Sequence, residues 1–269
     1  MLVEFTKMNG AGNDFVLIDN RERDLIFSEK EISRLCHRQR GIGADGLILL
    51  ENCKNGKADY AWKFYNSDGS QAEMCGNGSR CFAKFVQLLT QKTVPFSFET
   101  LAGIIHAEFV NNLVKVSLTQ PIDLSIGTNL SWEDQSGEVH SINTGVPHAI
   151  HFVKDINSIP VKLWGAALRY HKHFEPRGTN VNFVQLMPDQ SIRVRTYERG
   201  VEDETLACGT GVTASALITA RVFNLSSPIK VLTQGGDILQ VGFQWDGTRF
   251  YNVNLTGPAE VCFTGRIEI

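Results

Sequence analysis

Several features that mark common protein classes are missing from this sequence. No block of basic residues occurs, and the formal net charge of −3 gives no sign of a nucleic-acid partner. The N-terminal residues lack the apolar core of a signal peptide, and no apolar run approaches the ~20 residues of a membrane span. We therefore expect a soluble, cytoplasmic protein with neither nucleic-acid nor membrane partners.

Motifs for common metals and cofactors are missing as well. The sequence has no C-x-x-C pair, which argues against structural zinc and thioredoxin-like redox chemistry. It also has no Walker-type phosphate loop and no lysine motif for a pyridoxal Schiff base. We expect no metal, no cofactor and reduced thiols at all six cysteines, which are Cys36, Cys53, Cys75, Cys81, Cys208 and Cys262.

What the sequence does contain is a long internal repeat. Residues 73–79 and 206–212 both read Cys-Gly-polar-Gly, and the same offset separates residues 100–103 from 233–236. Further echoes in the same order link 64–69 with 196–200 and 116–121 with 253–258. Such a repeat in 269 residues predicts two like domains of roughly 100–150 residues each. We place them at 1–119, with 262–269 returning to the first, and at 120–261.

Within each half, the pattern predicts strands around one buried helix. Apolar residues after Cys75 recur at helical spacing, and the stretch 212–223 is apolar nearly all round. A capping box at Ser28 predicts a helix to about Arg38, and another helix is expected from Pro160 to about His171. Expected strands are 14–19, 47–50, 96–118 with a turn, 179–187, 192–198, 229–232, 238–243, 250–255 and 261–269. The predicted fold class is α+β.

A cysteine at the start of a helix is placed for acid/base chemistry. The first helical turn offers unpaired backbone N–H groups and about half a positive charge, which favour the thiolate form. Gly76, Gly78, Gly209 and Gly211 lack Cβ atoms, so these N–H groups can approach an anion closely. Two such helix starts aimed at one point would hold a carboxylate and stabilise negative charge as the neighbouring carbon loses a proton.

This arrangement predicts inversion at a carbon next to a carboxylate. One cysteine, as thiolate, removes the α-proton from one face, and the other, as thiol, protonates the opposite face. Cys75 and Cys208 are the candidates, because position, glycine context and duplication agree for both. An inert core cysteine is the usual interpretation of a single buried thiol, and we apply it to Cys36, Cys53, Cys81 and Cys262.

At these residues the chain resembles diaminopimelate epimerase, a cofactor-independent enzyme of lysine and peptidoglycan precursor synthesis, over nearly its whole length. The matching motifs lie at residues 9–15, 66–70, 75–80, 197–200 and 207–211. The resemblance implies two pseudo-symmetric domains, each a β-barrel-like sheet wrapped round a central helix, with the active site in the cleft between them. It implies interconversion of LL- and meso-diaminopimelate by the paired cysteines.

The resemblance also implies roles for further residues. It implies that Glu198 and His148 tune the two thiols, since a nearby carboxylate would oppose thiolate formation and a protonated imidazole would favour it. It implies that Arg199, with Glu198, holds the substrate, because a guanidinium pairs with both oxygens of a carboxylate. The substrate-binding residues carried over by position are Asn13, Asn66, Gly76, Asn77, Asn180, Glu198, Arg199, Gly209 and Thr210.

Three departures from the family pattern bear on selectivity. Val146 stands where many members have asparagine, and Gly46 where many have glutamine. The loop at residues 200–205 is one residue longer than its commonest form. We therefore expect a weaker grip on the remote end of the substrate and some turnover of smaller amino acids.

Two other functions and the assembly stay open at this point. A proline racemase-like enzyme, or another amino-acid racemase, would share the cysteine pattern but typically carries histidine where Asn77 stands. A thiol redox sensor would use Cys75 and Cys208 as a switchable pair. The sequence does not settle the oligomeric state, and a homodimer is one open assembly.

Overall fold

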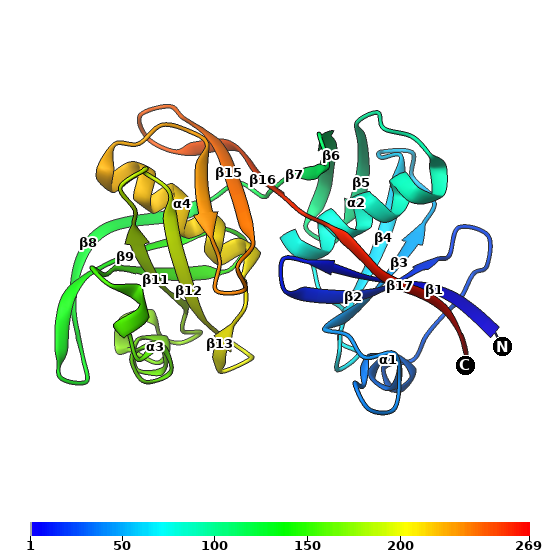
Figure 1. The fold of residues 1–269 in the computed structure, drawn as a ribbon, viewed down its shortest axis with the longest axis horizontal. Helices are drawn as coiled ribbons and strands as arrows, with labels where there is room; N and C mark the ends of the chain where they lie inside the picture. Colours follow the sequence, from blue (N-terminus) through cyan, green and yellow to red (C-terminus); the bar gives the residue numbers. More distant parts are fainter. Residues whose placement is uncertain (1) are drawn as a thin grey trace. The chain divides into compact units, whose positions relative to one another are not determined.

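The chain folds into two compact units in the computed structural model, which describes residues 2–269 (Figure 1). The first unit comprises Met1–Ser117 and Gly257–Ile269, and the second comprises Leu118–Thr256. These boundaries differ by a few residues from the expected domain limits at 119 and 262. Met1, the first residue of the expected N-terminal domain, lies outside the described residues.

The first unit is a strongly curved sheet of eight strands around one helix. Neighbouring strands pair in the order β17, β1, β2, β3, β4, β5, β6 and β7, with parallel pairs at β2–β3 and β4–β5 and antiparallel pairs elsewhere. The strands are β1 (Leu2–Gly10), β2 (Asn13–Asp19), β3 (Gly46–Glu51), β4 (Tyr60–Asn66), β5 (Phe96–Thr100), β6 (Gly103–Val110), β7 (Leu113–Ser117) and β17 (Glu260–Glu268).

The second unit repeats this order of pairing. Its strands run β8, β9, β10, β11, β12, β14, β15 and β16, again with parallel pairs at the third and fifth steps, β10–β11 and β12–β14. A short extra strand, β13 (Asp203–Thr205), pairs with β12. The other strands are β8 (Ile122–Trp132), β9 (Gln135–Asn143), β10 (Pro147–Phe152), β11 (Asn180–Leu186), β12 (Ile192–Glu198), β14 (Ile229–Leu232), β15 (Ile238–Trp245) and β16 (Phe250–Gly257).

Each unit encloses one long helix that begins directly after a Cys-Gly motif cysteine. Helix α2 (Gly76–Thr90) packs on β1, β2, β3 and β7, and α4 (Gly209–Phe223) packs on β9, β10, β11, β12, β14 and β15 (Figure 1). The first eight residues of α2 are all buried, and so are eleven residues of α4. The apolar character that predicted two enclosed helices therefore reflects their burial, and the predicted α+β fold of two like units is confirmed.

The remaining helices lie at corresponding places in the two units. Helix α1 (Glu29–Cys36) connects β2 to β3, and its capping box forms as expected between Ser28 and Glu31. Helix α3 (Val161–Arg169) connects β10 to β11 and is shorter than the expected helix to His171, because the chain turns into the 3₁₀ segment η2 (Lys172–Phe174). A second 3₁₀ segment, η1 (Ile156–Ser158), precedes α3.

The sequence pattern gave no expectation for several strands. These are β1, β4, β8, β9, β10 and β13. In β8 and β9 only scattered side chains are buried and no clear alternation marks a strand, whereas β10 has a buried run from His148 to Ile150. By contrast, the expected return of the C-terminus is confirmed, since β17 pairs antiparallel with β1. Among residues 2–269, no helix has both the length and the apolar character needed to cross a membrane.

Candidate active site

The start of α2 presents Cys75 as its N-cap. Cys75 has extended backbone dihedrals, and its Sγ accepts a hydrogen bond from the backbone N–H of Gly78 at 3.4 Å. A sulfur in this position takes the place of the hydroxyl or carboxylate oxygen that usually caps a helix. Negative charge on Sγ is stabilised there by the N–H group and by the helix dipole.

Two predicted site residues of the first unit contact each other beside this helix start. Asn77 is fully buried in the first turn of α2, and its Nδ2 donates to Oδ1 of Asn13 at 2.7 Å. The guanidinium of Arg80, one turn further along, is also fully buried. It donates to the carbonyls of Gly76 and Gly10 and to Oδ1 of Asn77. The structure therefore brings Cys75, Gly76, Asn77 and Asn13 to one end of α2.

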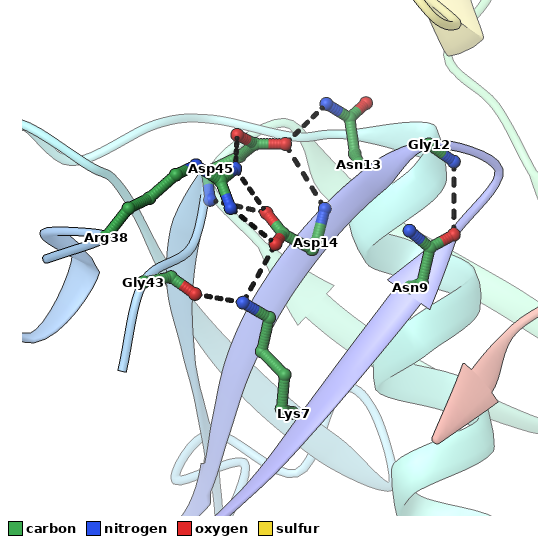
Figure 2. Close-up of polar contacts among 8 residues, drawn as sticks. All are labelled: Lys7, Asn9, Gly12, Asn13, Asp14, Arg38, Gly43 and Asp45. Carbon is green, nitrogen blue, oxygen red and sulfur yellow. Dashed lines mark hydrogen bonds and ion pairs between the residues drawn. The ribbon is translucent and has the colours of Figure 1, made fainter. Parts of the chain in front are cut away.

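A cluster of charged side chains lies next to Asn13 (Figure 2). Asp14 accepts hydrogen bonds from Arg38 and forms an ion pair with Lys7 at 2.8 Å, and Lys7 also donates to the carbonyl of Gly43. Burial alone would raise the pKa of Asp14, but the hydrogen bonds from Arg38 and Lys7 outweigh burial and hold the pKa at about 2. Asp14 is therefore a permanent anion that fastens α1's C-terminal loop to β1 and β2.

Asn66, another predicted site residue, ends β4 and lies opposite Gly46 in the β3–β4 ladder. Its Nδ2 donates to Ser70 Oγ at 3.1 Å. Gly46 is closely covered, because a Cβ atom there would lie 2.5 Å from the Tyr65 carbonyl oxygen and 2.7 Å from the Phe64 ring. A side chain at residue 46 would therefore require movement of β4.

The start of α4 presents Cys208, whose surroundings differ from those of Cys75. Cys208 is the N-cap of α4 but makes no side-chain capping bond, and its Sγ lies 3.4 Å from Oγ1 of Thr210. The same Oγ1 lies 2.9 Å from Nε2 of His148, which is fully buried. A glycine at residue 211 makes room for this contact, since a Cβ there would lie 3.3 Å from the His148 ring.

The hydrogen bonds around His148 determine its tautomer. Asn182 Nδ2 donates one hydrogen to the Ala149 carbonyl at 3.1 Å, which fixes the orientation of the amide. Its other hydrogen points at His148 Nδ1, 3.1 Å away, so Nδ1 accepts and the ring proton lies on Nε2. Nε2 then donates to Thr210 Oγ1. The Thr210 hydroxyl and Cys208 Sγ lie 3.4 Å apart, and either can donate to the other. A neutral relay thus links His148 to the sulfur.

The burial of His148 bears on its expected role in tuning a thiol. A protonated imidazole near a thiol would favour the thiolate. Burial lowers the pKa of His148 to about 3, and the positive charge of Arg199 acts in the same direction. His148 is therefore neutral at physiological pH and acts on Cys208 through the Thr210 hydroxyl.

The remaining predicted residues of the second unit surround the same end of α4. Asn180 Nδ2 donates to the Pro147 carbonyl, and its Oδ1 accepts from the backbone N–H of Arg199, which follows Glu198 at the end of β12. Burial, followed by the charges of Arg169 and Arg177, lowers the pKa of Arg199. Within residues 2–269 no ion pair to a carboxylate is formed by Arg199, whereas Arg169 pairs with Glu202. A half-buried cation beside two other guanidinium groups attracts an external carboxylate.

Of the four cysteines expected to be inert core residues, Cys36 and Cys81 lie in the core, whereas Cys53 is partly buried and Cys262 is exposed. Cys36 and Cys81 are buried, and burial raises the pKa of both thiols, that of Cys36 to about 12. Cys53 and Cys262 are free thiols on or near the surface. No group of three or more His, Cys, Asp or Glu side chains in the described part of the chain is arranged to hold a metal ion.

The sequence assigned no function to four side chains that lie in the site: Asp45, Arg80, Asn182 and Thr196. Asn182 orients His148 and accepts from the Thr196 hydroxyl at 2.9 Å. Asn182 lies two residues after Asn180 on the same strand, and alternate strand residues share a face. This spacing could have indicated that Asn182 also faces the site. Arg80 stood inside the Cys75 motif, and Asp45 stood beside Gly46, but nothing in the sequence revealed their partners.

Comparisons with known proteins assign the chain to a family. The family model described as "Diaminopimelate epimerase" matches residues 5–122 and 140–261. The chain belongs to the diaminopimelate epimerase family. It is 44% identical to the diaminopimelate epimerase of Aquifex aeolicus, covering 99% of this chain and 98% of that protein. It is 38% identical to that of Chlorobaculum tepidum, covering 97% and 100%.

Solved structures of other proteins share the fold at low sequence identity. A hydroxyproline epimerase from Agrobacterium vitis with bound trans-4-hydroxy-L-proline superposes with a TM-score of 0.74 at 14% identity, covering 99% of this chain and 92% of that one. A PhzF-family phenazine biosynthesis protein from Bacillus anthracis gives 0.75 at 14% identity, with both chains fully covered. At such identity the likeness extends to the fold alone, and it confirms the two-domain epimerase-type architecture.

Gly211 and Gly78, each three residues after its cysteine, provide a matched test of this packing. A Cβ on Gly211 would lie 2.4 Å from Asn182 Oδ1, whereas one on Gly78 approaches no atom closer than 3.3 Å, the end of the Ile48 side chain. We expect Gly211→Ala to lose roughly 1–3 kcal/mol of unfolding free energy through overpacking. Gly78→Ala should stay within about 1 kcal/mol of the wild type, since alanine favours the helix. Urea unfolding measures both, and equal losses would contradict the assigned contact.

The neutral state of His148 is a second testable expectation. Because its folded pKa of about 3 lies below the ordinary histidine pKa of 6.5, the unfolded chain binds more protons in acid. Stability from this group is therefore full above about pH 6.5 and declines as the pH falls toward 3. We expect ¹⁵N NMR of labelled histidine to show His148 as the Nε2–H tautomer throughout pH 5–8. An imidazolium signal from His148 at pH 6 would overturn the relay.

Proposed function

We propose that this protein interconverts LL- and meso-diaminopimelate with Cys75 and Cys208 as its two acid/base residues. The observation that carries the proposal is that both cysteines cap buried helices inside units of the same topology. Family membership over nearly the whole chain supplies the substrate class. The product supplies lysine and peptidoglycan precursor synthesis.

The proposed reaction is a proton exchange across one stereocentre. The two units close on the substrate, so that the sulfurs of Cys75 and Cys208 lie on opposite faces of the α-carbon. One sulfur, as thiolate, takes the α-proton, and the other, as thiol, protonates the opposite face. Backbone N–H groups at Gly76–Asn77 and Gly209–Thr210 hold the α-carboxylate and stabilise the negative charge that develops on it.

The remote end of diaminopimelate carries a second carboxylate and an ammonium group, and the second unit offers matching charges. Arg199 is half-buried beside Arg169 and Arg177, and its backbone is held by Asn180. A guanidinium that lies close to two other cations gains most from a carboxylate that accepts two of its N–H bonds. Glu198, the preceding residue, provides the negative charge for the ammonium group. Asn13 and Asn66 complete the proposed pocket from the first unit.

Exchanging either sulfur for oxygen tests the two-thiol mechanism. We expect Cys75→Ser and Cys208→Ser each to slow epimerisation at least about 10²-fold, because serine is a poor acid and base at neutral pH. Each variant should still exchange the α-proton with D₂O from one stereoisomer only, and the two variants should act on opposite isomers. Cys262→Ser, on an exposed thiol, is the control with wild-type activity. Near-normal epimerisation by either active-site variant would refute the proposal.

We further propose that the pocket is less selective than that of a typical relative. Gly46 has no side chain to bind a substrate, and Tyr65 and Phe64 leave no space for one there. Val146 likewise has no amide with which to hydrogen-bond a substrate. A site that hydrogen-bonds a polar group rejects analogues lacking it by roughly 10⁴-fold, so fewer such groups mean weaker rejection. Glutamate, which has two carboxylates on a shorter chain, is the competing substrate to examine.

Selectivity is measured as the ratio of kcat/KM for LL-diaminopimelate to that for L-glutamate. We expect a ratio below about 10⁴ in the wild type and a higher one in Val146→Asn, which restores an amide. Val94→Asn, at an exposed valine of the first unit, controls for the substitution itself. A wild-type ratio of 10⁴ or more that Val146→Asn leaves unchanged would contradict relaxed selectivity.

Location and assembly form the last part of the proposal. We place the enzyme in the cytoplasm, where its substrate class is made, and propose a homodimer. Supporting a dimer, β17 pairs only with β1 among the described strands and carries the exposed side chains of Val261 and Phe263. An unpaired strand edge with apolar side chains favours association with a second chain.

The alternative functions fit the site less well. A proline racemase-like enzyme shares the fold, but Arg199 and its neighbouring arginines have no role for a substrate with one carboxylate. A redox sensor needs neither the carboxylate cradle nor the relay to Cys208. Solvent deuterium at the α-carbon of recovered diaminopimelate separates an epimerase from a sensor.

A further inference from the structure

A continuous chain of side-chain hydrogen bonds runs from buried Arg80 to Asp45 in the first unit. Arg80 Nη2 donates to Asn77 Oδ1 at 3.0 Å, and Asn77 Nδ2 donates to Asn13 Oδ1 at 2.7 Å. Asn13 Nδ2 then donates to Asp45 Oδ2 at 3.0 Å. The link between Asn13 and Asp45 is drawn in Figure 2.

The two ends of this chain force a single direction on it. A guanidinium only donates hydrogen bonds, so the Asn77 oxygen must face Arg80. Asp45 receives donors from Asn13, from the backbone N–H of Asp14 and from Arg38, so it acts only as an acceptor. Both asparagine amides between these ends therefore have one allowed orientation, and turning either one would place two like groups against each other.

The chain leaves a defined half of the Asn13 amide for a ligand. An asparagine amide has two N–H donors and two acceptor sites on its oxygen. Asn77 occupies one acceptor site of the Asn13 oxygen, and Asp45 accepts one of the two Asn13 N–H bonds. One N–H and one acceptor site remain on a side chain that is only partly buried. We propose that Asp45 and Arg80 are positioning residues that fix which way Asn13 presents its amide to the substrate. This inference rests on the proposed function, in which Asn13 lines the pocket.

The required property of Asp45 is its acceptor oxygen rather than its charge. Its ion pair is made with Arg38, whose side chain is 58% exposed and also pairs with Asp14. Exposed pairs of this kind contribute little. An asparagine at residue 45 can keep an oxygen toward Asn13 and turn its amide nitrogen toward the exposed side. The conservative variant should therefore preserve the orientation of Asn13.

The first experiment compares Asp45→Ala with Asp45→Asn in steady-state kinetics on LL-diaminopimelate. We expect Asp45→Ala to raise KM roughly tenfold, the usual effect of one misdirected buried hydrogen-bonding group, and to leave kcat within about twofold. Asp45→Asn should keep KM within about threefold of the wild type. Glu51→Ala is the matched control, because Glu51 also accepts from an asparagine, Asn20, and pairs with Lys63. It should lower stability without changing KM.

The second experiment tests the other end of the chain and the ion pair. Asn77→Asp has the same shape and still accepts from Arg80, but it loses the N–H that fixes Asn13 Oδ1. We expect its KM to rise about as much as that of Asp45→Ala. Arg38→Gln breaks the ion pair and leaves the chain intact, so it should lower Tm and leave KM unchanged.

The outcomes separate this inference from the proposed function. A wild-type protein inactive on diaminopimelate would refute the function itself. An active wild type with a folded Asp45→Ala variant of unchanged KM would overturn the positioning role alone. Asp45→Asn as impaired as Asp45→Ala, with Arg38→Gln equally impaired, would show that the charge matters and would also overturn it.

Discussion

The first turn of a buried helix leaves backbone N–H groups without partners inside the helix, and in both units a cysteine stands where those groups begin. Because α2 and α4 are enclosed by strands, water cannot satisfy these groups freely. The glycines after each cysteine keep the first turn open to an anion. The rest of each unit serves this arrangement, since the curved sheet both buries the helix and brings strand ends to its start.

The two helix starts share a topology but not an electrostatic environment. Beside Cys75 lies the fully buried guanidinium of Arg80, whose charge is linked through two amides to Asp45. At the position corresponding to Arg80, α4 carries the neutral residue Thr213. Its hydroxyl donates to the carbonyl of Gly209, which is the counterpart of the Gly76 carbonyl that Arg80 contacts. Cys208 is approached by a hydroxyl that a neutral imidazole orients. A substrate with two different faces gives a physical reason for such asymmetry within a repeated fold.

Sequence patterns predicted those parts of the molecule that rest on local chemistry. The capping box of α1 and the two helices after Cys75 and Cys208 follow from neighbouring residues. Strands β8 and β9 were not predicted because they are half-exposed and their buried residues do not alternate clearly. The link between Asn77 and Asn13 spans 64 positions, and that between Asn182 and His148 spans 34. Such partners depend on strand register, which a single sequence does not display. The burial that lowers the pKa of His148 depends on the same long-range packing.

The proposed function requires Cys75 and Cys208 to meet across one stereocentre, and a direct cross-link between them is its most immediate test. The protein would be oxidised mildly with diamide, with and without diaminopimelate, and its disulfide-linked peptides mapped by mass spectrometry. The account predicts a Cys75–Cys208 disulfide that forms in step with loss of activity, is prevented by substrate and is reversed by dithiothreitol. Complete oxidation that joins these two cysteines while activity persists, or inactivation by any other pairing alone, would contradict it.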